Sequence, residues 1–195
     1  MTRKEEKQNL RRIIRELERG LSPRYRQASS QAICAHMMAM PEYQDADTVF
    51  CFVGTAHEID TKPILEDVLQ RGKTLCVPLC VTPGHFEVRQ ITALSQLVPG
   101  TMGILEPTQD CPLVTVDSID FAIVPCLTCN HNGQRLGKGG GYYDRFLSHY
   151  RGGTVMVCQE KLIREEIPVE PHDYPIHWVL TETCLYEDGT PARLG

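Results

Sequence analysis

Residues 137–141 contain four glycines, and two cationic side chains accompany them in the sequence. The glycines occupy positions 137, 139, 140 and 141, and the cations are Arg135 and Lys138. Glycine lets a backbone adopt positive φ and approach a ligand closely. Successive N–H groups at a helix N-terminus bind anions, and the helix dipole assists them. The pattern therefore favours a phosphate-binding loop over a surface turn, which needs only one or two glycines.

This loop differs from two common nucleotide-binding loops. Gly72-Lys73-Thr74 resembles the end of a P-loop, but position 67 is Asp where that motif requires glycine. The helix predicted there also precedes its strand, which reverses the P-loop order. No G-x-G-x-x-G sits at the first strand–helix turn, so the dinucleotide fingerprint is absent as well.

Three carboxylates are candidates for metal or ligand binding. Asp144 directly follows the glycines, where it could hold a Mg²⁺ ion that bridges phosphate oxygens, or could simply favour the helix N-terminus electrostatically. Asp173 is a possible second ligand, although alone it is an ordinary loop residue. Glu58 follows the first predicted strand, at the sheet edge where open α/β sheets bind ligands.

The chain has nine cysteines, and two of them form the motif Cys126-Leu-Thr-Cys129. Zinc sites usually pair two such motifs, and redox motifs usually open a helix, whereas this one opens a long loop. A metal or redox role stays open, but we expect these thiols to be small buried hydrophobic groups.

The elements that position these residues follow from periodicity and capping. We predict helices over 3–19, 23–40, 61–71 and 142–150 from the helical spacing of apolar residues. Helix start and stop residues support these bounds, namely Ser22, Pro23, Thr61 and Gly72. Continuous apolar runs predict buried strands over 48–53, 74–79, 120–125, 154–157 and 176–181. Residues 85–92 alternate and predict an edge strand, and residues 95–118 and 130–141 predict loops.

Strands that alternate with helices indicate a mostly parallel sheet between helical layers. We expect an α/β fold, a single three-layer α/β/α Rossmann-like domain over residues 1–195, with the helical segment 3–40 packed on it.

Composition and charge exclude several classes of protein. The chain of 195 residues is 42% hydrophobic and 23% charged, with ordinary globular values that argue against disorder. The net charge of −5 argues against broad nucleic-acid binding, and residues 1–30 alone carry a basic excess. No apolar run approaches the ~20 residues that span a bilayer, and the charged N-terminus does not look like a signal peptide. We therefore expect a cytoplasmic protein with reduced thiols and with neither membrane nor nucleic-acid partners.

Residues 132–147, NGQRLGKGGGYYDRFL, closely resemble the signature of the 5-formyltetrahydrofolate cyclo-ligase (methenyltetrahydrofolate synthetase) family. Further segments resemble the family's other motifs, in the same order over nearly the whole chain. These are Lys7-x-x-x-Arg11, His57-Glu-Ile-Asp-Thr61, Lys73 to Pro78, Gly103-Ile-Leu-Glu-Pro107, Ile167-Pro-Val-Glu-x-His-Asp173 and Val179-Leu-Thr-Glu182.

The resemblance implies that ATP and Mg²⁺ convert 5-formyltetrahydrofolate to 5,10-methenyltetrahydrofolate. It implies catalytic roles for Lys138, Arg135 and Tyr142, and Mg²⁺ ligation by Asp144 and Asp173. Folate would contact Val53, Glu58, Met102, Lys138 and Tyr142. The expected ATP contacts are Lys7, Arg11, Arg135, Leu136, Gly137, Lys138, Gly139, Gly140, Gly141, Tyr142 and Tyr143. The partner would be a reduced folate, bound by a monomer or a weak homodimer.

The sequence departs from the family pattern at a few positions. Met102 stands where an aromatic residue is usual, Leu162 where Gln is frequent, and Cys126 to Asn130 replace a Gly-x-x-Phe-Asp segment. Two alternatives therefore stay open: a paralogue that phosphorylates another amide-like metabolite, and a non-catalytic folate- or nucleotide-binding protein.

Overall fold

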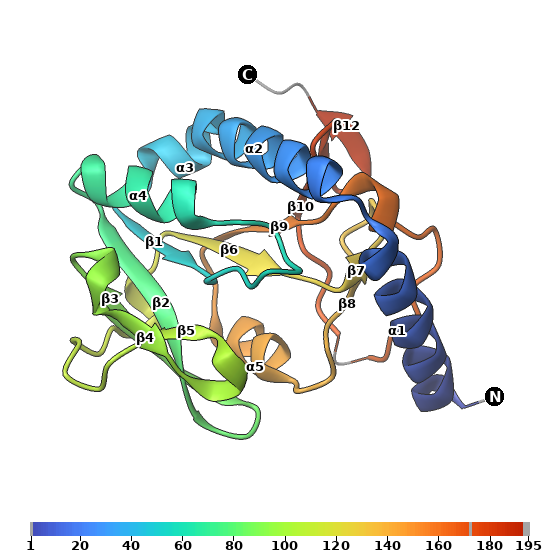
Figure 1. Cartoon of the computed structure of the whole chain (residues 1–195), viewed down its shortest axis with the longest axis horizontal. Helices are drawn as coiled ribbons and strands as arrows, with labels where there is room; N and C mark the ends of the chain where they lie inside the picture. Colours follow the sequence, from blue (N-terminus) through green and yellow to red (C-terminus); the bar gives the residue numbers. More distant parts are fainter. Residues whose placement is uncertain (1, 172, 193–195) are drawn as a thin grey trace.

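The computed structural model of the chain describes residues 2–171 and 173–192, except the side chain of Met102 (Figure 1). The helices are α1 (Arg3–Gly20), α2 (Pro23–Ala39), α3 (Pro41–Asp45), α4 (Lys62–Gln70) and α5 (Tyr142–His149). The main sheet contains β1 (Thr48–Cys51), β2 (Thr74–Thr82), β3 (His85–Ile91), β6 (Phe121–Pro125), β9 (Gly153–Val157), β10 (Trp178–Leu180), β11 (Leu185–Glu187) and β12 (Thr190–Ala192). Two small sheets pair β4 (Leu97–Pro99) with β5 (Leu105–Pro107) and β7 (Thr128–Cys129) with β8 (Arg135–Leu136).

The main sheet is mixed, and its centre is parallel. Its strand order is β12-β11-β10-β9-β6-β1-β2-β3. The five strands from β10 to β2 run parallel, whereas β3, β11 and β12 are antiparallel to their neighbours. The chain reverses its direction of travel across the sheet between β1 and β6, so loops from both halves meet at the carboxyl ends of these strands.

Alternating side chains of the sheet bury two separate cores. Val49 of β1 packs with Ile33 and Ile64 from α2 and α4 on one face. Phe50, the next residue, packs with Phe146 of α5 on the other face, where their rings are stacked with centroids 4.8 Å apart. The sheet therefore lies between α2, α3 and α4 on one side and α5 on the other (Figure 1). The expected α/β fold with its mostly parallel sheet is confirmed.

Helix α1 lies beyond the carboxyl end of β6, beside β7 and β8 (Figure 1). Thr2 and Glu5 form a capping box at its start, with each side chain accepting the other's backbone N–H. Its apolar residue Ile14 is buried with the α5 core. The arrangement leaves the basic face of α1 next to the loops that follow the parallel strands.

The structure differs from the sequence-based expectation mainly in short elements. Strand β2 extends to Thr82, and β10 covers only Trp178–Leu180 of the predicted 176–181 strand. The segment 95–118, predicted as loop, contains β4 and β5, and the predicted loop 130–141 contains β8. Helix α3 and the hairpin β11–β12 were not predicted. The short strands are defined by their pairing partners, which a sequence pattern does not reveal. Helix α3 has only five residues, too few to show a helical period.

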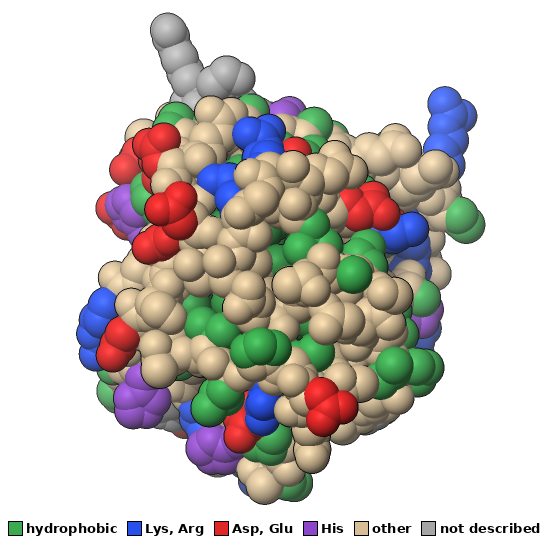
Figure 2. Space-filling view, turned by 90° about the vertical axis from the view of Figure 1, so that its left-hand side faces the viewer, with side chains coloured by type: hydrophobic (Ala, Val, Ile, Leu, Met, Phe, Trp, Pro, Cys, Tyr) green, Lys and Arg blue, Asp and Glu red, His purple; other side chains and the backbone are tan. Residues whose placement is uncertain are grey.

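Figure 2 views the molecule from the side of β3 and β4, where exposed hydrophobic side chains lie among polar groups. Val98, Leu105 and Leu113 are among the exposed large apolar residues. None of the helices in the described ranges is both long enough and apolar enough to cross a membrane.

Candidate active site

The glycine-rich loop follows the hairpin β7–β8 and ends at the first turn of α5. Gly139 and Gly141 have φ values of 107° and 70°, which L side chains rarely adopt, and Gly141 is the N-cap residue of α5. Gly140 faces the Tyr142 ring, and a Cβ there would lie 2.7 Å from it. The local sequence therefore requires glycine at these positions, and it places free backbone N–H groups of the α5 N-terminus beside the loop.

Two basic residues of α1 contact this loop. Arg11 donates from Nε to the Gly137 carbonyl at 2.9 Å, and Arg15 lies 3.5 Å from the Lys138 carbonyl. Burial and then the charge of Arg15 lower the pKa of Arg11. Like charges that gather beside a glycine-rich helix N-terminus create a site that favours an anion.

Lys7 forms a buried ionic contact between α1 and the segment 170–173. Its Nζ lies 2.6 Å from Glu170 Oε2 and 2.7 Å from Asp173 Oδ2, and its side chain is 11% exposed. Burial opposes the charge of Lys7, but the hydrogen bonds to Asp173 and Glu170 outweigh it and raise the pKa of the ammonium group. The structure thus brings Lys7 and Asp173, 166 positions apart, into direct contact.

Lys138 and Glu58 form a second ion pair across the site. The Lys138 Nζ lies 2.6 Å from Glu58 Oε1, and the lysine side chain is 50% exposed. The other oxygen, Glu58 Oε2, accepts hydrogen bonds from the backbone N–H and hydroxyl of Thr55 at 3.0 and 2.8 Å. Glu58 is therefore fixed in direction by its own loop, whereas Lys138 reaches it from the glycine-rich loop.

Asp144 pairs with Arg135, which is 5% exposed, while Asp144 is 41% exposed. The charges of Asp144 and Asp173 also raise the pKa of Arg11, against the larger effects of burial and Arg15. Each of the two predicted metal ligands thus pairs with a cation, Asp144 with Arg135 and Asp173 with Lys7.

The other predicted folate contacts differ in their burial. Val53 is 9% exposed and packs in the core at the end of β1, and Tyr142 lies partly exposed at the start of α5. The side chain of Met102 lies outside the described part of the chain. Its turn is anchored by the buried Glu106, which accepts the backbone N–H groups of Thr101 and Cys80 at 3.0 and 3.3 Å.

Sequence reasoning missed several residues that hold the site together. Thr55 fixes Glu58, and Gly54 allows the loop to close, because a Cβ at Gly54 would lie 2.0 Å from the Ile59 carbonyl. Arg145 donates to the carbonyls of Gly84 and Gly140, at 2.9 and 3.3 Å, and so ties the glycine-rich loop to the β2–β3 turn. The sequence shows a glycine at position 54, shortly after the first predicted strand, and an arginine directly after Asp144. It does not show which distant groups these two residues contact.

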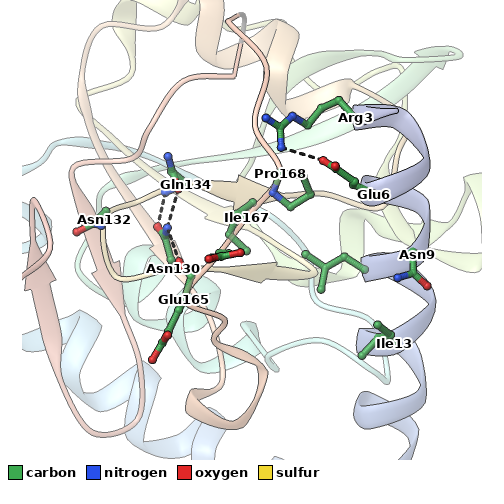
Figure 3. Close-up of a pocket in the computed structure, with 12 residues that line it drawn as sticks. Arg3, Glu6, Asn9, Ile13, Asn130, Asn132, Gln134, Glu165, Ile167 and Pro168 are labelled. Atoms are coloured by element: carbon green, nitrogen blue, oxygen red, sulfur yellow. Dashed lines mark hydrogen bonds and ion pairs between the residues drawn. The ribbon is translucent and has the colours of Figure 1, made fainter. Parts of the chain in front are cut away.

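A hollow lies between α1 and the segment 165–168 (Figure 3). It measures about 560 Å³, and amide side chains such as Asn130 and Gln134 line it together with Ile13 and Ile167. Asn130 and Gln134 hydrogen-bond each other at 2.7 Å, so this wall is fixed. None of the predicted site residues lines this hollow within the described ranges, and we place the candidate site at the charged cluster instead.

Comparison with known proteins identifies the family. Residues 3–182 match the 5-formyltetrahydrofolate cyclo-ligase family. The chain belongs to this family. It is 32% identical over 181 residues to 5-formyltetrahydrofolate cyclo-ligase of Escherichia coli strain K12, covering 90% of this chain and all of the relative. It is 26% identical over 196 residues to the 5-formyltetrahydrofolate cyclo-ligase of Mus musculus, covering 94% of each chain.

Solved structures agree with this membership of the 5-formyltetrahydrofolate cyclo-ligase family. The NMR structure of Aquifex aeolicus 5,10-methenyltetrahydrofolate synthetase superposes with a TM-score of 0.84 at 27% identity, covering 97% of this chain and 96% of that one. A Mycoplasma pneumoniae 5,10-methenyltetrahydrofolate synthetase superposes with a TM-score of 0.73, covering 90% of this chain and 98% of that one. At 17% identity, the second likeness concerns the fold alone. The resemblance found in the sequence, and with it the prediction of an enzyme, is confirmed.

Proposed function

We propose that this chain converts 5-formyltetrahydrofolate to 5,10-methenyltetrahydrofolate, with ATP as co-substrate and with release of ADP and phosphate. The observation that carries the proposal is the contact of Arg11 and Arg15 with the glycine-rich loop, which holds Lys138 and leads into the N-terminus of α5, in a chain of this family. The nine free thiols fit a reducing compartment such as the cytoplasm.

The reaction explains why the site is rich in cations. A formyl amide is inert because its oxygen is a poor leaving group. In the proposed reaction this oxygen attacks the γ-phosphorus of ATP and displaces ADP, giving an iminophosphate. N10 of the folate then attacks the formyl carbon and loses its proton to the solvent, and the oxygen leaves with the phosphate. Catalysis is mainly a matter of positioning and charge stabilisation.

The ion pairs of the site suggest how the substrates bind. Lys138, which is half exposed and pairs with Glu58, is well placed to exchange this carboxylate for a phosphate or formyl oxygen. The exchange would leave Glu58, still fixed by Thr55, to accept N–H groups of the pterin ring. Arg135 and the loop from Leu136 to Tyr143 would surround the triphosphate, with Tyr142 at its end.

The carboxylates Asp144 and Asp173 suit a Mg²⁺ ion, because hard cations prefer oxygen ligands. The charges of both act on Arg11, which donates to the glycine-rich loop where phosphates are proposed to bind. When bound, the ion would neutralise charge on the phosphate oxygens. Asp144, which is 41% exposed, can turn from Arg135 towards it, and Asp173 would hold it close to Lys7.

The test is a direct assay of the product. Methenyltetrahydrofolate absorbs in the near ultraviolet where the substrate does not, so the chain should produce this absorbance with 5-formyltetrahydrofolate, ATP and Mg²⁺ together. Reactions without ATP or without Mg²⁺ serve as controls. Absence of the signal in the complete mixture would refute the proposal, and tight binding of both ligands without turnover would identify a non-catalytic binding protein.

A further inference from the structure

Three cysteine thiols converge at the carboxyl edge of the sheet. Cys126 follows β6, Cys129 ends β7, and Cys158 follows β9, and their Sγ atoms all lie within 4.8 Å of one another. The parallel register that pairs Pro125 with Val157 brings the residues after each strand, Cys126 and Cys158, side by side. Among the described residues, this is the one group of three or more His, Cys, Asp or Glu side chains found at such a spacing.

The geometry fits a shared ligand better than a set of inert apolar groups. Zinc–sulfur bonds of ~2.3 Å at tetrahedral angles place thiolate sulfurs about 3.8 Å apart. The three sulfurs therefore need to approach by about 1 Å at most, and Cys126 is partly exposed. A disulfide would join only two of the thiols, and all nine cysteines of the chain are free.

Hydrogen bonds to the backbone orient two of the three thiols. Cys126 Sγ donates to the Val157 carbonyl and Cys158 Sγ to the Gln159 carbonyl, each at 3.5 Å. A cation that binds the three sulfurs would replace the protons of these thiols.

The fourth coordination position is open on one side. Cys126 and Cys158 line a small cavity of about 20 Å³, together with Gln159, Glu18 and Glu58. A cavity of this size holds one water molecule. Burial raises the pKa of Glu18 at its rim. A three-thiolate site with one water ligand is a known type of zinc-class coordination, and three thiolates with a divalent cation leave one negative charge, close to Arg135.

We propose that Cys126, Cys129 and Cys158 bind one thiophilic divalent cation of the zinc class, with a water in the adjacent cavity as its fourth ligand. Soft thiolates select such ions over Mg²⁺, so this site is chemically distinct from Asp144 and Asp173. The proposal concerns binding alone and does not depend on the proposed cyclo-ligase reaction. The sequence did not predict it because the third thiol lies on a different strand.

The test is a titration of the reduced, full-length chain, without an affinity tag, with Cd²⁺. Cadmium bound to thiolates gives an ultraviolet charge-transfer absorption, and we expect it to saturate at one ion per chain. Zn²⁺ added in competition should remove this absorption. Failure of the wild-type chain to give a saturating band would overturn the proposal.

Variants separate this site from the other thiols. Cys126→Ser, at the partly exposed position, should weaken Cd²⁺ binding at least ~100-fold while circular dichroism shows a folded chain. The matched control is Cys184→Ser, which changes a partly exposed cysteine outside the cluster, and it should bind one ion as the wild type does. A band that survives Cys126→Ser, or that is lost in Cys184→Ser, would contradict the assignment.

The pH dependence of binding provides an independent check. The protons of the thiols must leave for the solvent when the cation binds, so the apparent affinity should rise with pH. We expect binding at least about tenfold tighter at pH 8 than at pH 6. An affinity for Cd²⁺ that does not change over this range would show that the thiols are not the ligands.

Discussion

Lys7 and Lys138 are both predicted to meet the phosphates of ATP, yet the fold holds them in opposite ways. Lys7 is 11% exposed and contacts two carboxylates, whereas Lys138 is 50% exposed and pairs with Glu58. Lys7 comes from a regular helix and Lys138 from a loop with three glycines directly after it. The difference indicates a division of work, in which Lys7 joins α1 to the segment 170–173 and Lys138 can change its partner when substrates bind.

Replacement of Lys138 by Met should have the largest effect. Turnover should fall by about a thousandfold, because the ammonium charge is proposed to stabilise the transition state. The folate KM should change far less, as measured by methenyltetrahydrofolate absorbance. Lys4→Met, at an exposed position of α1, is the matched control and should leave turnover unchanged. Equal losses in turnover and in folate affinity would contradict the proposed role.

Lys7→Met tests whether Lys7 stabilises the fold by joining α1 to the segment 170–173. It removes the cation that lies between Glu170 and Asp173. We expect the free energy of unfolding to fall by about 2 kcal/mol. This loss is smaller than that for a fully buried ion pair, because Glu170 is partly exposed. Urea denaturation measures this loss. The Lys138→Met variant should lose less than ~0.5 kcal/mol in the same experiment. Similar losses in the two variants would mean that both lysines are held alike.

Glu58→Gln tests the exchange of partners at Lys138. The amide keeps the size of the carboxylate but weakens its charge-assisted hydrogen bonds, so the folate KM should rise about tenfold. The ATP KM should stay the same or fall, because Lys138 no longer has a competing carboxylate. Initial rates at varied concentrations of each substrate give both constants. A rise in the ATP KM as large as that for folate would count against the exchange.

The smallest effect is expected from Asp144→Asn. It removes one proposed Mg²⁺ ligand that is exposed and leaves Asp173, so the Mg²⁺ concentration for half-maximal rate should rise several-fold. Asp110→Asn, on an exposed loop away from the cluster, is the control. An unchanged Mg²⁺ requirement would show that Asp144 pairs with Arg135 but does not bind the ion.

The sequence predicted the parts of the site that depend on local chemistry. The start of α5 after Gly141 and the parallel strands β1, β2, β6 and β9 follow from glycine conformation and from continuous apolar runs. Contacts between distant segments did not follow, because their partners are set by packing. The sequence predicts Lys7 as an ATP contact and Asp173 as a metal ligand, but not their contact with each other. Nothing in the sequence links Cys158 to Cys126.

The two ends of the main sheet have consequences for how the chain meets its own copies. A free edge strand offers unpaired N–H and C=O groups to another chain. The β3 edge is already occupied, since Gln90 donates to the Pro112 carbonyl and Val114 to that of Val88, each at 2.9 Å. At the opposite edge, β12 carries Pro191, which has no N–H to donate. Both edges of the sheet therefore disfavour aggregation by strand pairing between copies of the chain.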